Sequence, residues 1–296
     1  MIDQPLVSIV IPCYNHEHFV QDCIQSVIDQ TYQNIELIII DDGSSDDSVT
    51  KIEEMLSLCK ERFTKFEFRD RPNKGLSSTL NEAIDWCQGK YFSAIASDDL
   101  LLKDKVNIQV MLMEKNNEIS ALFGSVDYIN ENNEIKINNE LKEDEYNFDR
   151  IILNDCSIYA PTQMMVLQLL KEIGGYDPSI KVEDWYMWLK MAEKGKVYCI
   201  SNKLAIYRIH SGNSTRNTKM IYDNNMKTLS LYESHYLYNK AFNKITWIYI
   251  IWSGQTDRKS SFFSLLNFLK NKPTQLFSKN FLVYLKYNFL KIKNWY

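Results

Sequence analysis

Short apolar runs alternate with amphipathic stretches along the first part of the chain. Leu6 to Ile11 is a β-branched, apolar run that ends at Pro12, which is typical of a buried strand. From His18 to Asp29 apolar side chains recur at helical spacing. Ile35 to Ile40 predicts a second buried strand, and a polar turn after it leads into a helix over Ser48 to Lys60.

The same alternation continues to about residue 100. Phe66 to Arg69 predicts a short third strand, Leu76 to Trp86 a helix and Tyr91 to Ala96 a fourth strand. This order of strands and helices predicts an α/β fold with a doubly wound, mostly parallel sheet. In such sheets ligands bind outside the carboxyl ends of the strands.

The middle of the chain is less regular. Asn130 to Asp149 is rich in Asn, Glu and Asp, and we expect a solvated hairpin or loop there. Met164 to Ile173 is apolar and ends at Gly174-Gly175, which we interpret as a flexible hinge. Tyr186 to Lys194 predicts a helix, and Val197 to Ile209 predicts strands.

The C-terminal part, from about Ser214, is helical and aromatic in pattern. Residues 240–296 contain fourteen aromatic residues, among them Trp295, and ten basic residues against one acid, Asp257, for a net charge of +9. The rest of the chain has 24 basic and 37 acidic residues, a net charge of −13. Aromatic anchors mixed with lysines on amphipathic helices are typical of elements at an anionic membrane surface. The alternative is that these helices pack on the catalytic part or on another subunit.

Composition disfavours several classes of protein. The longest apolar run in the C-terminal part, Ile245 to Trp252, is shorter than the ~20 residues of a spanning helix, and we see no secretory signal. The six cysteines form no CxxC pair, so we expect reduced structural thiols. The basic region lacks a recognisable nucleic-acid module. We therefore expect a cytoplasmic protein that does not bind nucleic acid.

Polar clusters follow the first two predicted strands. Tyr14 could pack its ring against a nucleobase, and the alternative is an ordinary turn in which Asn15 caps the next helix. Asp42, beside Gly43, could accept a uracil N–H or bind ribose hydroxyls. The alternative is that Asp41 and Asp42 cap the following helix.

Further carboxylates and a histidine follow later strands. Asp98 and Asp99 are costly side by side unless a cation or hydrogen bonds hold them, and their oxygens suit Mg²⁺ or Mn²⁺; the alternative is a solvated turn. Glu183 and Asp184 open a helix, where a carboxylate could act as a general base or simply stabilise the helix dipole. His210 is either a metal ligand or a surface histidine. The other three histidines are interpreted as surface residues: His16, His18 and His235.

Taken in order, these motifs resemble one known family. The segments that carry the resemblance are Val7 to Asn15, Gln30-Thr31-Tyr32 with Glu36 to Ser44, Asn73-Lys74-Gly75, Ser97-Asp98-Asp99, Gly174-Gly175-Tyr176-Asp177, Glu183-Asp184-Trp185 and Tyr207-Arg208-Ile209-His210. Over roughly Leu6 to Ser214 the chain resembles family 2 glycosyltransferases of the GT-A fold, such as those that build O-antigens and capsular polysaccharides. The resemblance implies a GT-A catalytic domain over 1–213, with a nucleotide-binding half to about 110 and an acceptor-binding half from about 111, followed by a helical extension over 214–296.

The resemblance also implies an activity and a set of site residues. The chain would be an inverting glycosyltransferase that moves a hexose or N-acetylhexosamine from a UDP-sugar to a glycan or polyprenyl-diphosphate-linked acceptor. Asp184 would be the catalytic base. Mn²⁺ or Mg²⁺ would be bound by Asp98, Asp99 and His210, with Asp99 preferred as the direct ligand. The donor-binding residues would be Pro12, Tyr14, Asp42, Asn73 and Asp98.

Two positions depart from the family's pattern. Ala96 stands where the family often has Asp, and Leu80 stands where it often has Arg. Arg71 or Lys74 then becomes a candidate for the diphosphate contact. The departures also support an alternative, a non-catalytic nucleotide-sugar-binding relative. A dinucleotide-binding oxidoreductase is disfavoured because no GxGxxG follows the first strand, and a nucleotidyltransferase because that loop is not rich in Gly and basic residues.

Overall fold

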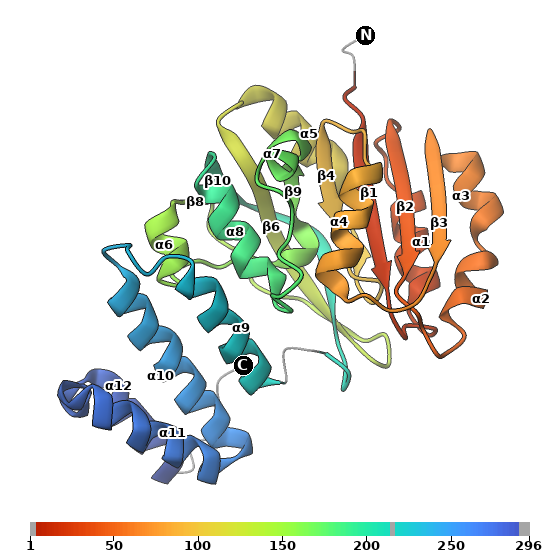
Figure 1. Ribbon diagram of the computed structural model, residues 1–296. Helices are drawn as coiled ribbons and strands as arrows, with labels where there is room; N and C mark the ends of the chain where they lie inside the picture. The colour runs from red at the N-terminus through yellow and green to blue at the C-terminus, as the bar shows by residue number, and fades with distance from the viewer. Residues whose placement is uncertain (1–3, 214–216, 290–296) are drawn as a thin grey trace. The chain divides into compact units, whose positions relative to one another are not determined.

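The computed structural model describes residues 4–213 and 217–289, which fall into two compact units. One unit comprises Met1–Ile151 and Cys156–Gly212, and the other comprises Ile152–Asp155 and Asn213–Tyr296 (Figure 1). Ser214, where the sequence places the start of the helical extension, and the C-terminal residues that include Trp295 lie outside the described residues.

The first unit is built around one mixed sheet. Its strand order is β3-β2-β1-β4-β9-β6-β10-β5, with β7 paired to β6 and β8 paired to β10. The strands are β1 Val7–Cys13, β2 Ile35–Asp41, β3 Lys65–Asp70, β4 Tyr91–Ala94, β5 Leu100–Leu101, β6 Ile119–Asn130, β7 Ile135–Lys136, β8 Asp144–Tyr146, β9 Met164–Val166 and β10 Lys196–Ile209.

Helices connect these strands and cover the sheet. Figure 1 shows α4, α7 and α8 together on the near face. The helices before residue 213 are α1 Val20–Ile28, α2 Ser48–Glu53, α3 Leu56–Arg62, α4 Leu76–Trp86, α5 Lys105–Lys115, α6 Phe148–Ile152, η1 Ala160–Thr162, α7 Leu167–Glu172 and α8 Glu183–Ala192.

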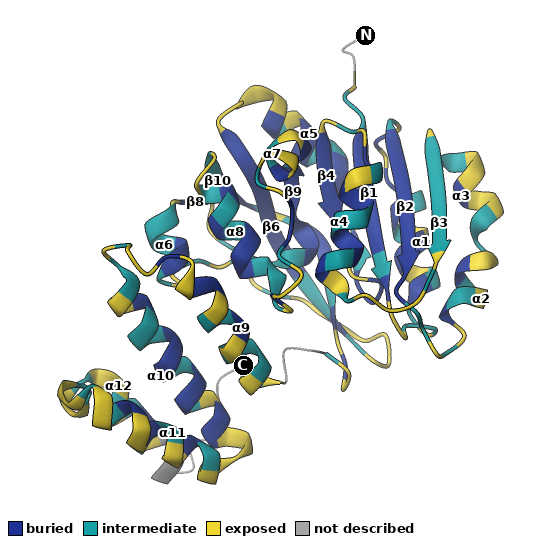
Figure 2. Ribbon diagram, viewed as in Figure 1, coloured by how far each residue is buried: buried dark blue, intermediate teal, exposed yellow. Residues whose placement is uncertain are grey.

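The core follows from the period-two alternation of the strands. Ile9 and Ile11 of β1 pack in one apolar cluster with Val20 and Ile24 of α1, whereas the intervening Val10 is buried outside that cluster. Every residue of β2 and β4 is buried, as Figure 2 shows by their dark blue strands. Strands buried on both faces require the continuous apolar runs from which they were predicted.

The α/β class with flanking helices is confirmed, and the first four strands are parallel as predicted. The rest of the sheet is more mixed than predicted, since β9 runs antiparallel to both β4 and β6. Two predicted elements are also divided. The helix expected over Ser48 to Lys60 is two helices, α2 and α3, and the apolar run Met164 to Ile173 is the strand β9 followed by α7.

The second unit is helical and has its own small core. Its elements are α9 Thr218–Ser230, α10 Tyr238–Thr256, α11 Arg258–Asn271, η3 Pro273–Phe277 and α12 Lys279–Phe289. Trp247 and Ile250 of α10 pack against Leu265 and Phe268 of α11 and Tyr284 of α12. In the described part of the chain, no helix has the length and apolar character of a membrane-spanning segment.

Candidate functional site

The loops that follow β1 and β2 are tied together by reciprocal hydrogen bonds. The Asn15 amide donates to Ser44 Oγ at 2.8 Å, and the Ser45 amide donates to Asn15 Oδ1 at 2.8 Å. Asn15 adopts a left-handed φ of 54°, which Asn tolerates better than most residues. The alternative in which Asn15 caps the next helix is therefore wrong, because that helix begins at Val20 without a side-chain cap bond.

This arrangement leaves Tyr14 at the carboxyl edge of the sheet with half of its surface exposed. Pro12, near the end of β1, is half-buried. Asp41 is fully buried and accepts hydrogen bonds from the amide and the hydroxyl of Ser44 at 2.7 and 2.6 Å. Asp41 therefore stabilises the turn, and does not cap α2, whose N-cap residue is Asp47.

Asp42 lies at the centre of a second group of contacts. Its Oδ1 accepts from the Arg71 guanidinium and from the Lys74 amide at 2.8 Å, and its Oδ2 accepts from the Gly75 amide at 2.9 Å. Arg71 Nε also donates to Glu82 at 2.9 Å. Arg71 is thus engaged by two carboxylates, which orients Asp42 at the edge of the sheet and leaves Lys74 as the more exposed of the two basic residues.

Asn73 is exposed in the loop that contacts Asp42, and the loop after β2 packs tightly against it. A Cβ at Gly43 would lie 2.6 Å from the Asn73 backbone nitrogen, and Gly43 has a φ of +76°. Only glycine satisfies both requirements. Backbone geometry therefore requires glycine at position 43, the third residue of the Asp-Asp-Gly sequence.

Three potential metal-ligand side chains, which follow β1, β4 and β10, meet at the carboxyl edge of the sheet. Nε2 of His210 lies 2.8 Å from Asp98 Oδ2, and Nε2 of His16 lies 3.9 Å from the same oxygen. Ligand atoms of the three residues lie within 4.8 Å of one another. The interpretation of His16 as a surface histidine is wrong, since it is half-buried and its Nδ1 lies 2.8 Å from Ser97 Oγ. Two imidazoles and a carboxylate suit a divalent transition metal ion.

Asp99 points to a different partner. Its Oδ1 accepts the Arg208 amide at 2.8 Å, and Arg208 Nε donates to the Asp98 carbonyl oxygen at 2.8 Å. Burial raises the pKa of Asp99 well above its usual range, and the charge of Asp98 raises it further. The sequence predicts Asp99 as the preferred direct ligand, whereas Asp98 is the carboxylate that faces the two imidazoles.

Glu183 and Asp184 form the first turn of α8. Burial raises the pKa of Asp184 to about 6, and burial together with the charge of Asp184 raises the pKa of Glu183 to about 8. The charge of Asp184 also raises the pKa of Asp99, so it acts on the region of the metal-ligand group. A carboxylate with a raised pKa that remains ionised near neutral pH is suited to accept a proton.

The turn before α8 is anchored to α4. Asn81 Nδ2 donates to the Tyr176 carbonyl oxygen, and the Tyr176 amide donates to Asn81 Oδ1, both at 2.8 Å. Gly174 and Gly175 have φ values of +81° and +73°, and a Cβ at Gly175 would lie 2.4 Å from Asn81 Oδ1. These glycines therefore form a fixed turn and not the predicted hinge.

The carboxyl edge thus gathers an oriented carboxylate, an exposed aromatic ring, a candidate metal centre and a half-buried carboxylate with a raised pKa. The glycosyl transferase family 2 model matches residues 8–174, more than half of the chain. The chain belongs to glycosyl transferase family 2.

Curated relatives of this family 2 glycosyltransferase differ in length. It is 32% identical over 200 residues to the Escherichia coli UDP-Glc:alpha-D-GlcNAc-diphosphoundecaprenol beta-1,3-glucosyltransferase WfgD, covering 68% of this chain and 75% of WfgD. It is 34% identical over 211 residues to an uncharacterized glycosyltransferase of Rickettsia felis, covering 71% of this chain and 34% of the relative. The chain therefore spans about a third of the length of that relative and of a similar one from Rickettsia conorii.

Solved structures share the fold at low identity. The Staphylococcus aureus TarS 1–349 complex with UDP-GlcNAc has a TM-score of 0.64 at 15% identity, over 87% of this chain and 75% of that one. The mannosyltransferase PcManGT of Pyrobaculum calidifontis, in complex with GDP-Man and Mn²⁺, has a TM-score of 0.61 at 10% identity, over 97% and 84% of the two chains. Both likenesses support the GT-A fold of the glycosyltransferase.

The residue that the sequence interpretation missed is His16. Its signal was its place, two residues after Tyr14 in the loop at the carboxyl end of β1. Asp98 and His210 follow β4 and β10, and the carboxyl ends of parallel strands meet at one edge of a sheet. The same argument that selected Tyr14 therefore applies to His16.

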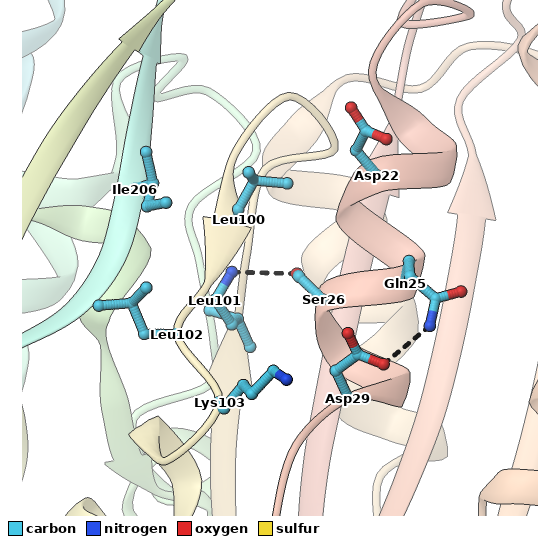
Figure 3. Close-up of a pocket in the computed structure, with 9 residues that line it drawn as sticks. All are labelled: Asp22, Gln25, Ser26, Asp29, Leu100, Leu101, Leu102, Lys103 and Ile206. Atoms are coloured by element: carbon cyan, nitrogen blue, oxygen red, sulfur yellow. Dashed lines mark hydrogen bonds between the residues drawn. The ribbon is translucent and has the colours of Figure 1, made fainter. Parts of the chain in front are cut away.

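A shallow groove of about 330 Å³ lies between α1 and the segment Leu100–Lys103, which follows Asp99 directly in the chain (Figure 3). Its lining combines the apolar residues Leu100–Leu102 and Ile206 with the acidic residues Asp22 and Asp29. Ser26 Oγ accepts the Leu101 amide at 3.0 Å there, which satisfies a donor of the short strand β5. The groove contains none of the predicted donor, metal or catalytic residues.

Proposed function

We propose that the chain is an inverting glycosyltransferase that transfers a hexose or N-acetylhexosamine from a UDP-sugar to a hydroxyl of a glycan or lipid-linked sugar in bacterial surface polysaccharide synthesis. The observation that carries the proposal is the convergence of His16, Asp98 and His210 at the sheet edge that also holds Asp42. The name of WfgD and the UDP and UDP-GlcNAc complexes of TarS support a uridine nucleotide donor.

The donor would lie along the loops after β1, β2 and β3. Tyr14 presents an exposed ring on which a uracil can stack, and the half-buried Pro12, two residues earlier, would complete this part of the donor site. Asp42 offers a carboxylate that Arg71 and two amides hold in place, so it can accept the uracil N–H without losing side-chain freedom on binding. Asn73, exposed beside Asp42, completes the proposed donor set.

Asp98 and His210 would bind Mn²⁺ or Mg²⁺ close to the donor diphosphate. Their ligand atoms fit such an ion, because Asp98 Oδ2 and His210 Nε2 already approach to 2.8 Å and both side chains are buried and fixed. A bound divalent ion would neutralise the negative charge that develops on the leaving diphosphate.

Asp184 would act as the base. It accepts the proton of the acceptor hydroxyl while that oxygen forms a bond to the anomeric carbon. The bond between the anomeric carbon and the diphosphate oxygen breaks in the same step, and UDP leaves with the electron pair. A single displacement inverts the configuration, so an α-linked donor gives a β-glycoside without a covalent enzyme intermediate.

The test is UDP release from a panel of UDP-hexoses, with Mn²⁺ and with EDTA, by the native chain and Asp98→Ala. Slow hydrolysis of one donor that EDTA and the substitution both abolish would support the transferase and identify the sugar. Donor binding without turnover, even with lipid-linked acceptors, would favour the non-catalytic relative. Failure of every uridine nucleotide to bind would overturn the donor assignment.

We also propose that the helical unit binds an anionic membrane surface. On α11 an exposed stripe runs Lys259, Phe263, Leu266, Lys270, at helical spacing and opposite the buried Leu265. Phe263 is 63% exposed. Apolar side chains between lysines suit an interface where the rings enter the headgroup region and the ammonium groups meet anionic lipid.

The next helix repeats the arrangement. Lys279, Leu282 and Lys286 are exposed at positions i, i+3 and i+7 of α12, and Phe277 in η3 is 94% exposed. Asp257 is the one acidic residue from 240 to the end of the sequence, so repulsion from anionic lipid is slight. A peripheral position on the inner face of the cell membrane would bring the enzyme to a polyprenyl-diphosphate-linked acceptor.

A further inference from the structure

The metal-ligand group contains a histidine that the family resemblance did not supply. His16 comes from the loop after β1, Asp98 from the loop after β4 and His210 from the end of β10. Three separate segments thus direct one ligand atom each toward a common point, with all three atoms within 4.8 Å of one another. A single surface histidine beside a carboxylate would not require this convergence.

The loop around His16 holds its imidazole in position. The His16 amide donates to Ser48 Oγ at 2.9 Å, which fixes the backbone. Nδ1 lies 2.8 Å from Ser97 Oγ, so Nε2 is the ring atom that faces Asp98. A hydrogen bond to the other ring nitrogen is the usual way in which proteins orient a metal-ligating imidazole.

The imidazole of His210 is packed as firmly as that of His16. The His16 and His210 rings meet edge to face, with centroids 5.8 Å apart, and the His210 ring lies 5.1 Å from the Phe19 ring. His210 is 9% exposed, and a Cβ at Gly212 would lie 3.2 Å from its ring. The two nitrogens and the Asp98 oxygen are therefore preorganised.

Asp99 is arranged to position the group and not to bind the ion. Its Oδ1 accepts the amide of Arg208, two residues before His210, and only 2% of its surface is exposed. Arg208 Nε in turn donates to the Asp98 carbonyl oxygen. These bonds fix the end of β10 against the Asp98 loop, which places His210 beside Asp98.

We propose that His16 is a third protein ligand of the metal site, beside Asp98 and His210, with Asp99 as a positioning residue. The inference rests on the proposed function, since it concerns the ion of that same site. Imidazole nitrogen is a good ligand for the first-row transition ions, so Mn²⁺ alone can report whether the second imidazole binds.

The test measures Mn²⁺ binding to the full chain in the absence of nucleotide by electron paramagnetic resonance. Pulsed methods then count the ¹⁴N nuclei that couple to the bound ion. The native chain should bind one Mn²⁺ coupled to two imidazole nitrogens. His16→Ala should bind Mn²⁺ roughly tenfold or more weakly and retain one nitrogen coupling. His16→Asn, which replaces the imidazole nitrogen by an amide, should likewise retain one nitrogen coupling.

Two variants serve as controls. His18→Ala lies in the same loop with a side chain that is 78% exposed, so both nitrogen couplings and the affinity should persist. Asp99→Asn should also keep both couplings, because its side chain acts through Arg208. Circular dichroism of the metal-free variants reports whether each one folds.

The outcomes separate the inference from the proposed function. Two nitrogen couplings in His16→Ala, or no Mn²⁺ bound by the native chain, would overturn the metal site. Two-nitrogen Mn²⁺ binding in a chain that releases no UDP from any donor would support the site while the proposed function fails.

Discussion

Asp98 Oδ2 lies 2.8 Å from Nε2 of His210, although 112 positions separate the two residues in the chain. In the sheet, β9 and β6 stand between β4 and β10. The contact forms because the chain after Asp99 crosses to β10 as β5 and pairs with it, Leu100 opposite Ile206. The two-residue strand β5 therefore brings the loop that contains Asp98 next to His210.

Asp184→Asn should abolish transfer while donor binding persists. The amide keeps the size of the side chain and cannot accept the acceptor proton, so we expect a loss of about 10² to 10⁴ in turnover. Transfer is measured as UDP release in the presence of the acceptor. Donor affinity is measured separately by calorimetry. Glu193→Gln, at the other end of α8, is the matched control and should retain activity. Full turnover in Asp184→Asn would remove Asp184 from the role of base.

The pH dependence of the reaction should follow the ionisation of Asp184. Because burial raises its pKa to about 6, the base is increasingly protonated as the pH falls below that value, and turnover should fall with it. A profile of turnover at saturating donor between about pH 5 and pH 8 tests this. A flat profile would contradict the assignment.

Stability should change with pH in the opposite sense. A carboxyl whose pKa is higher in the folded than in the unfolded chain stabilises the fold while protonated, and that contribution is lost as the pH rises through the folded value. Asp184, with its ordinary pKa of 3.8 raised to about 6, should therefore oppose folding increasingly over that interval. Asp184→Asn should raise the melting temperature more at mildly alkaline pH than at acid pH, measured by calorimetry. An equal rise in melting temperature at both pH values would show that ionisation of Asp184 does not destabilise the fold.

Gly43→Ala should weaken donor binding and destabilise the fold. The methyl group would lie 2.6 Å from the Asn73 backbone, in addition to the strain of a φ of +76°. We expect a cost of about 1 to 3 kcal/mol, read from denaturant unfolding. Gly75→Ala is the matched control, since its φ is +86° but its Cβ would meet nothing within 4 Å. Equal destabilisation of both variants would mean that the close approach to Asn73 has no effect.

Phe263→Ser should reduce binding to vesicles that contain anionic lipid. Loss of one ring that enters the headgroup region should weaken binding roughly tenfold, by the apolar area it no longer buries. Co-sedimentation with phosphatidylcholine vesicles, with and without phosphatidylglycerol, measures this binding. Leu58→Ser, an exposed apolar residue of α3, is the control. Unchanged binding of Phe263→Ser would contradict the membrane surface proposed for α11.

The sequence predicts the parts of the fold that follow from local pattern. The helix Leu76–Trp86 has the predicted bounds, because its apolar positions are spaced for a helix and Gly75 marks its start. The division of Met164 to Ile173 could not be predicted, since a buried strand and a buried helix both require apolar side chains throughout. No Pro or Gly lies at the break between α2 and α3, so the sequence pattern does not predict that break.

The candidate site was predictable to a similar degree. Residues at strand ends, such as Tyr14 and Asp42, follow from the rule that ligands bind at the carboxyl edge of the sheet. The different orientations of Asp98 and Asp99 could not be predicted, because they depend on where the Arg208 amide lies across the sheet. The strand-end position of His16 was predictable in the same way as that of Tyr14, whereas its approach to Asp98 depends on a contact between distant segments.

The bonds between Asn15, Ser44 and Ser45 have a consequence for how the donor specificity of this enzyme can change. Each of the two loops satisfies a backbone amide of the other with a side chain. Both bonds are exposed, so a substitution in one loop replaces a hydrogen bond from the other loop with one to water, a modest cost that a compensating substitution would remove. The two segments should vary as a pair during evolution, and libraries that randomise both together should yield folded variants more often than libraries that randomise either loop alone.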